Sequence, residues 1–212
     1  MDVTVIAKDD PRYPTAAMAL LGDRSPERIY AAGNPEILSQ PLLALFCSSR
    51  CPGAIILKTY DVVRSLRDSG VTVVSGFHSP IEKECLRLLL RGAQPIVICP
   101  ARSIERMRMP SEWRAPLAAG RLLILSPFDA KHPRVTAETA QYRNRFAAAL
   151  ATRILIPYAA PGSKTETFMQ EVGKWGKDVV GAQHPLVSPS SGSAGARRSP
   201  HKASAARWRG LT

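Results

Sequence analysis

Residues 42–75 read LLALFCSSRCPGAIILKTYDVVRSLRDSGVTVVS, and this segment sets the fold class. The runs Leu42–Cys47 and Val71–Ser75 are continuous and mostly apolar rather than alternating, which is typical of strands buried on both faces of a parallel sheet. Between them, residues 54–68 place apolar side chains on one helical face, and Gly70 follows as a stop signal. The segment therefore predicts a β-α-β unit.

The same alternation continues toward the C-terminus. Further strands are predicted at Pro95–Cys99, Arg121–Leu125 and Arg153–Ile156, and further helices at Ile81–Arg91, Glu138–Ala151 and Lys164–Trp175. Strands and helices that alternate through such short turns predict an α/β fold: a doubly wound, mostly parallel sheet with helices on both faces.

The two ends of the chain differ from this middle part. Residues 1–40 are rich in Pro, Arg and Gly, which predicts a short helical lead-in packed on the core. Residues 183–212 contain Ser, Pro and basic residues without any acidic residue or apolar periodicity. Such a segment buries too little apolar surface to offset its ordering entropy, so we expect a disordered basic tail after a core domain at 41–182.

The charge of the chain indicates the class of its partner. Its 212 residues include 29 Lys and Arg against 17 Asp and Glu, which gives a net charge of +12 and favours a polyanionic partner. No apolar run is long enough to span a membrane, and the first residues lack the pattern of a signal peptide. We therefore expect a cytoplasmic protein whose four cysteines are thiols.

In a doubly wound sheet, ligands bind beyond the carboxyl ends of the strands. The first such loop contains Ser49 and Arg50, which suit an anion, although an ordinary strand–helix turn explains them too. In the next loop, Ser75 and Gly76 would allow a ligand to approach the backbone, and Ser79 is predicted to cap the following helix. Cys47 and Cys51 have no second Cys or His pair at a spacing that would complete a zinc site.

Two later segments add basic and small residues. An alanine-rich helix is predicted to open with Arg143, Asn144 and Arg145. These residues are explained either by a phosphate-binding site or by a solvated helix face. Gly162, Ser163 and Lys164 form a turn of the anion-binding type, without the spacing of a Walker A motif. The sequence contains no motif of a catalytic triad, a metalloprotease or a dinucleotide-binding site. We therefore expect that the protein is not an enzyme and binds no cofactor.

Several motifs, in matching order, resemble the DprA/Smf family of bacterial DNA-processing proteins over about residues 10–180. Asp10–Pro14 and Ile29–Asn34 are similar to the family's "YP … LYxxGN" lead-in, and Ser48–Arg50 to its "GSR". The other similar segments are Val73–Glu82 for "VVSGLARGID", Arg143–Ala151 for "RNRIIAGLS" and Pro161–Thr165 for "SGSLIT".

This resemblance implies a Rossmann-like domain that binds single-stranded DNA, forms a homodimer, and loads a RecA-type recombinase during natural transformation, without a metal or nucleotide. With the loop chemistry, it predicts a DNA-binding site formed by Ser49, Arg50, Ser75, Gly76, Arg143, Asn144, Arg145, Gly162, Ser163 and Lys164. If these charges are exposed, Arg50→Ala or Arg143→Ala should weaken binding and leave the fold unaffected, with Arg28→Ala as a control outside the site.

The chain also departs from the family pattern. Ser48 replaces the glycine of "GSR", and Ser79 and Pro80 replace the arginine and glycine of the second motif. Residues 183–212 stand where many members carry a winged-helix domain. Two alternatives stay open: a nucleotide hydrolase of the lysine-decarboxylase-like (LOG) type, whose PGGxGTxxE motif is faintly similar to Pro161–Glu166, and a nucleotide-sensing domain of the same superfamily.

Overall fold

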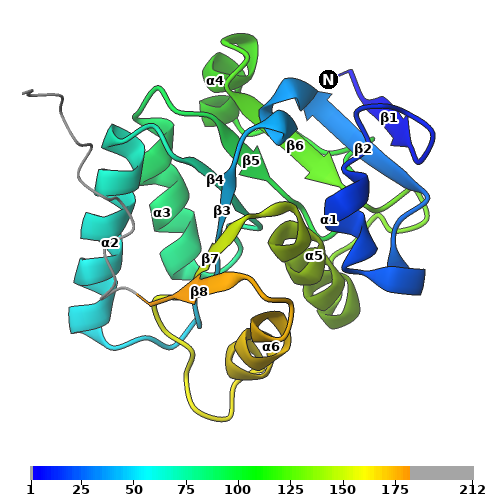
Figure 1. Ribbon diagram of the computed structural model, residues 1–212. Helices are drawn as coiled ribbons and strands as arrows, with labels where there is room; N and C mark the ends of the chain where they lie inside the picture. The colour runs from blue at the N-terminus through cyan, green and yellow to red at the C-terminus, as the bar shows by residue number, and fades with distance from the viewer. Residues whose placement is uncertain (1, 182–212) are drawn as a thin grey trace, which may run out of the picture.

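The computed structural model describes residues 2–181, and within this range eight strands form one sheet (Figure 1). The strands are β1 (Thr4–Ala7), β2 (Arg28–Gly33), β3 (Leu42–Leu45), β4 (Thr72–Ser75), β5 (Ile96–Ile98), β6 (Leu122–Ser126), β7 (Arg153–Leu155) and β8 (Asp178–Val180). Their order is β1-β2-β6-β5-β4-β3-β7-β8. Strands β3 to β8 pair in parallel, whereas β2 pairs antiparallel with both of its neighbours, β1 and β6. The predicted doubly wound, mostly parallel sheet is confirmed.

Helices cover both faces of this sheet, as predicted. They are α1 (Thr15–Ala19), α2 (Gly53–Asp68), α3 (Pro80–Leu90), α4 (Arg114–Ala118), α5 (Ala137–Leu150) and α6 (Lys164–Gly173). Because successive strand residues point to opposite faces, Leu43 and Leu45 pack with α2 and α3, whereas Ala44 packs with α1, α5 and α6. The continuous apolar runs of the sequence therefore supply two cores, one on each side of the sheet.

The first forty residues contain more than the predicted helical lead-in. They form α1 and two short 3-10 helices (Gly22–Arg24 and Pro35–Ser39), but also β1 and β2, which the sequence analysis did not predict. These two strands extend the sheet beyond β6, and α1 packs against α5. The segment is thus part of the sheet and of its core. The predicted tail at 183–212 lies outside the described residues.

The topology places a ligand site at one edge of the sheet. Strand β3 lies between β4 and β7, so the chain leaves β3 in one direction along the sheet and later returns to its other side. A crevice forms at such a switch point beyond the carboxyl ends of the strands. The N-termini of α5 and α6 lie at this same edge, because each helix runs back across the sheet.

No helix within residues 2–181 is long and apolar enough to cross a bilayer.

The C-terminal end of α5 is held by a lysine from the segment before β8. The Lys177 ammonium donates to the carbonyl oxygens of Ala148 and Ala149 at 2.7 Å each, and also to that of Ala151. Burial lowers the pKa of Lys177 to about 8. This one side chain therefore donates to three carbonyl groups at the helix end, of which that of Ala148 also accepts from the backbone N–H of Ala151.

We expect Lys177→Met to lower the free energy of unfolding by about 1–2 kcal/mol, because methionine keeps the apolar stem and loses the donors. Urea denaturation measures the change. Lys174→Met, at an exposed position nearby, is the matched control and should stay close to the wild type. Equal losses in the two variants would refute a specific capping role for Lys177.

Candidate functional site

A cleft of about 360 Å³ opens at the carboxyl ends of β3 and β4, between α5 and α6. Five of the ten predicted site residues line it: Ser49, Arg143, Asn144, Arg145 and Lys164. The other five, Arg50, Ser75, Gly76, Gly162 and Ser163, belong to the loops around it without lining it. The loops that the sequence analysis selected thus converge on one site, together with Glu82 and Glu171, to which it assigned no role there.

Arg143 forms part of the interior wall of this cleft. The residue is only 4% exposed, and its Nη1 donates to the carbonyl oxygen of Cys99 at 2.9 Å while its Nε donates to Asn144 Oδ1 at 2.8 Å. Burial lowers the pKa of the Arg143 guanidinium. The expectation that this residue is an exposed loop charge is therefore wrong, because it is a buried residue of α5, and the reason for expecting no effect of its removal on the fold no longer holds.

Gly76 allows a close approach, but the group that approaches is the protein's own arginine. A Cβ at this position would lie 1.3 Å from Arg143 Nη1. Ser75 next to it is fully buried, and its hydroxyl accepts from the backbone N–H of Phe77 at 3.1 Å. Phe77 has a φ of 46°, a left-handed conformation that is rare for an aromatic residue. The loop after β4 therefore packs against Arg143, which lines the cleft.

Glu82 connects the loops that follow β3 and β4. One carboxylate oxygen accepts from Cys47 N at 3.0 Å, and the other accepts from His78 N at 2.9 Å and Ser79 N at 3.3 Å. In return, the Ser79 hydroxyl accepts from Glu82 N at 3.2 Å. The predicted Ser79 cap is confirmed and completes a capping box. The spacing of Ser79 and Glu82 in the sequence could have indicated this pairing.

The loops after β3 and β7 are joined by a buried serine. The Ser48 hydroxyl accepts from Ala160 N at 3.0 Å and lies 3.4 Å from the Ser163 hydroxyl. Gly162 N donates to a Glu166 carboxylate oxygen at 2.7 Å, and Ser163 caps α6. The polar groups of this turn therefore have partners within the protein, and the serine that replaces the family glycine links two loops.

The basic side chains at the cleft differ in their pairing. Arg145 forms two hydrogen bonds with the Glu171 carboxylate, at 2.7 and 2.8 Å, which raise the pKa of Arg145. Arg50 and Lys164 are exposed and make no ion pair with a described residue. Lys164, which lines the cleft, and Arg50, on the loop after β3, are therefore exposed cations without an acidic partner among residues 2–181.

Three of the four cysteines are buried, and burial raises the pKa of all four thiols. Cys85 and Cys99 are buried, and burial raises the pKa of each thiol to about 12. Such thiols are poor nucleophiles at neutral pH. Within the described part of the chain, no three His, Cys, Asp or Glu side chains come together in a way that could hold a metal ion.

Comparisons with known proteins agree with this architecture. The profile of the family described as DNA recombination-mediator protein A matches residues 4–207. The fold is similar to that of DNA processing protein A (DprA) from Streptococcus pneumoniae, with a TM-score of 0.69 and 18% identity over 84% of this chain. The chain spans 62% of that structure. No curated protein matches it.

A second solved structure is that of DNA processing protein A from Helicobacter pylori, which has a unique single-stranded DNA binding mode. Its TM-score is 0.67 at 19% identity, over 84% of this chain and 80% of that one. At such identities the likeness shows the fold.

Proposed function

The chain belongs to the DNA recombination-mediator protein A family, and from this premise we propose that it processes DNA by binding single strands in the cleft between α5 and α6. The observation that carries the proposal is the convergence of the family-like motifs on one cleft at the switch point of the sheet. The net charge of +12 and the H. pylori relative support the same ligand.

In this proposal, the strand binds through its phosphates. Lys164 stands at the first position of α6, where the helix dipole also favours an anion, and Arg50 lies on the loop after β3. Phe46 and Phe168, whose rings lie 4.9 Å apart, give the floor of the cleft an apolar part that suits a base or a sugar. The buried Arg143 and Glu82 hold the walls in place.

We further propose that the protein loads a RecA-type recombinase during natural transformation, acts as a homodimer and catalyses no reaction itself. The two carboxylates that line the cleft are both engaged: Glu82 accepts from three backbone N–H groups, and Glu171 pairs with Arg145. Neither is free to act as the base of a nucleotide hydrolase, which argues against that alternative.

Titration with single-stranded DNA at several salt concentrations tests the proposal. We expect Arg50→Ala or Lys164→Ala to weaken binding by about 1–3 kcal/mol and to reduce the log–log salt slope by about one, because each removes one charged phosphate contact. Fluorescence anisotropy measures the affinity. The stability of the fold should stay unchanged, since both side chains are exposed.

The control is Arg91→Ala, an exposed arginine after α3 at the opposite edge of the sheet. Arg28 was chosen as the control from the sequence, but it lines a cleft next to the site and is therefore unsuitable as a control. Equal losses of DNA affinity in Arg91→Ala and Arg50→Ala would show that binding depends on the overall positive charge and not on a defined site. Absence of DNA binding at low salt, together with turnover of a nucleoside monophosphate, would favour the hydrolase instead.

A further inference from the structure

A second cleft, of about 600 Å³, lies on the other side of α5. Its walls come from the segment before and within β2, from the loop after β6 and from α5. Gln141 and Arg145, one helical turn apart on α5, line both this cleft and the first one. The two clefts therefore share one wall. A DNA strand bound in the first cleft would have to cross only helix α5 to reach the second.

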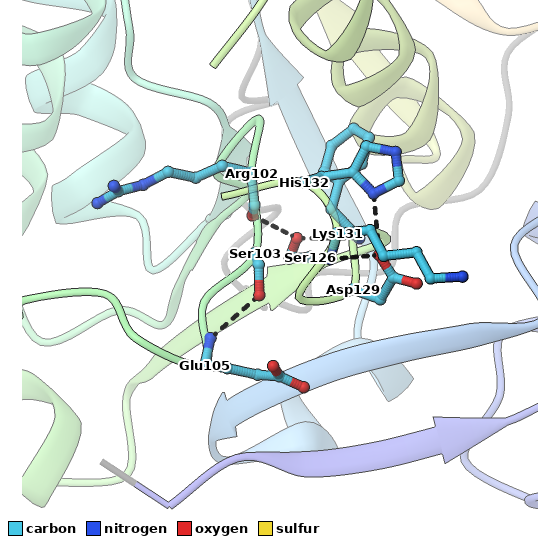
Figure 2. Close-up of polar contacts among 8 residues, drawn as sticks. Arg102, Ser103, Glu105, Ser126, Asp129, Lys131 and His132 are labelled. Atoms are coloured by element: carbon cyan, nitrogen blue, oxygen red, sulfur yellow. Dashed lines mark hydrogen bonds and ion pairs between the residues drawn. The ribbon is translucent and has the colours of Figure 1, made fainter. Parts of the chain in front are cut away.

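Aromatic rings line the second cleft in fixed orientations. Phe128 packs against His132 and Tyr142, with ring centroids 5.5 and 5.6 Å away. The Tyr142 hydroxyl donates to the carbonyl oxygen of Arg24 at 2.6 Å, which holds that ring in place. The half-exposed His132 ring is fixed by Asp129, with 2.9 Å between His132 Nδ1 and the carboxylate (Figure 2). Phe128 is itself buried, so the ring in this group that suits the stacking of a base is the exposed one of His132, which Phe128 supports.

The loop that carries His132 is itself braced. The Ser126 hydroxyl, at the end of β6, donates to the carbonyl oxygen of Arg102 at 2.7 Å and accepts from Phe128 N at 3.1 Å. Figure 2 shows Ser126 beside Arg102, with Asp129 and His132 on the neighbouring turn. This connection ties the aromatic loop to the loop after β5, so the stacking surface is set before any ligand binds.

Two arginines at the second cleft lack acidic partners. Arg24 and Arg28 are exposed and make no ion pair with a described residue, unlike Arg145, which is neutralised by Glu171. Asp23 and Glu138 also line the cleft, so its charge is mixed. A mixed rim with two free guanidinium groups suits one base with its flanking phosphates better than a long run of phosphates.

We propose that the second cleft is a nucleotide-binding subsite for the same DNA strand, with a base stacked on the exposed His132 ring, which packs against the buried Phe128, and a flanking phosphate on Arg24 or Arg28. The inference rests on the proposed function, since the strand must first occupy the cleft between α5 and α6. It extends the binding surface across α5 to Arg24, Arg28 and His132, which lie outside the family-like motifs.

A length series of oligothymidylates tests the subsite. The wild type, Arg24→Ala/Arg28→Ala and the control Arg91→Ala are titrated with a short strand that fills one cleft and a longer one that spans both. We expect the double variant to lose about tenfold in affinity for the long strand and to bind the short strand as the wild type does. In the wild type, 5-iodouracil in the long strand should photo-crosslink to His132 or Tyr142, as mapped by mass spectrometry.

The outcomes separate the two proposals. Unchanged affinity of the double variant for the long strand, or equal losses for both strands, would overturn the subsite while the first cleft stands. Crosslinks confined to residues of the first cleft would do the same. Failure of the wild type to bind either strand would overturn the proposed function and the subsite with it.

Discussion

Glu82→Gln is expected to lower the free energy of unfolding by about 2–4 kcal/mol, although the side chain keeps its size and shape. The buried Glu82 carboxylate accepts three backbone N–H groups, from Cys47, His78 and Ser79. A glutamine would turn an NH2 group toward at least one of these donors and leave it without an acceptor. Buried N–H groups without partners carry most of the expected loss.

The same substitution should also weaken DNA binding more than tenfold, because Glu82 ties together the loops after β3 and β4. Urea denaturation and anisotropy titration measure the two effects. The matched control is Glu84→Gln on the same helix, which removes only a surface pair with Arg87 and should cost no more than about 0.5 kcal/mol. Equal stability of the two variants would show that the Glu82 carboxylate does not hold these loops.

The sequence predicted the central strands well because their burial on both faces leaves an unambiguous pattern. Strands β3 to β7 were predicted with ends within two residues of those observed. Three strands were missed: β1 and β8 are the edge strands, whereas β2 lies inside the sheet, and its buried run Ile29–Ala32 was assigned to the helical lead-in. In β1, Thr4 and Val5 are exposed, and β8 has three residues of which Asp178 is exposed. Edge strands of this kind lack the continuous apolar run by which the others were recognised.

The site was predicted in part, because loop position follows from topology and side-chain pairing does not. The rule for carboxyl ends of strands selected the loops that carry Ser49 and Lys164, whereas Asn144 on α5 was proposed from its basic neighbours and from the family motif. It gave no indication that Arg145 pairs with Glu171, a residue 26 positions further along the chain. Likewise, the burial of Arg143 depends on the space beside a glycine from another loop.

The second large effect concerns this arginine and its glycine. Arg143→Ala should cost about 3–4 kcal/mol, because it removes a buried side chain and leaves the Cys99 carbonyl oxygen without its donor. Arg145→Ala on the same helix is the comparison. It breaks an ion pair with Glu171 whose two side chains are 24% and 28% exposed, and it should cost about 1 kcal/mol. Similar losses in the two variants would contradict a structural role that is special to Arg143.

Gly76→Ala distinguishes packing from charge. Its new Cβ would stand 1.3 Å from Arg143 Nη1, so the guanidinium must leave its place and abandon Cys99. We expect Gly76→Ala alone to cost about 2–4 kcal/mol, and less than about 1 kcal/mol when Arg143 is already alanine, because the space is then vacant. A double-mutant cycle by urea denaturation measures this coupling. Additive losses of unfolding free energy would mean that the buried Arg143 guanidinium is not the reason why this loop carries a glycine at position 76.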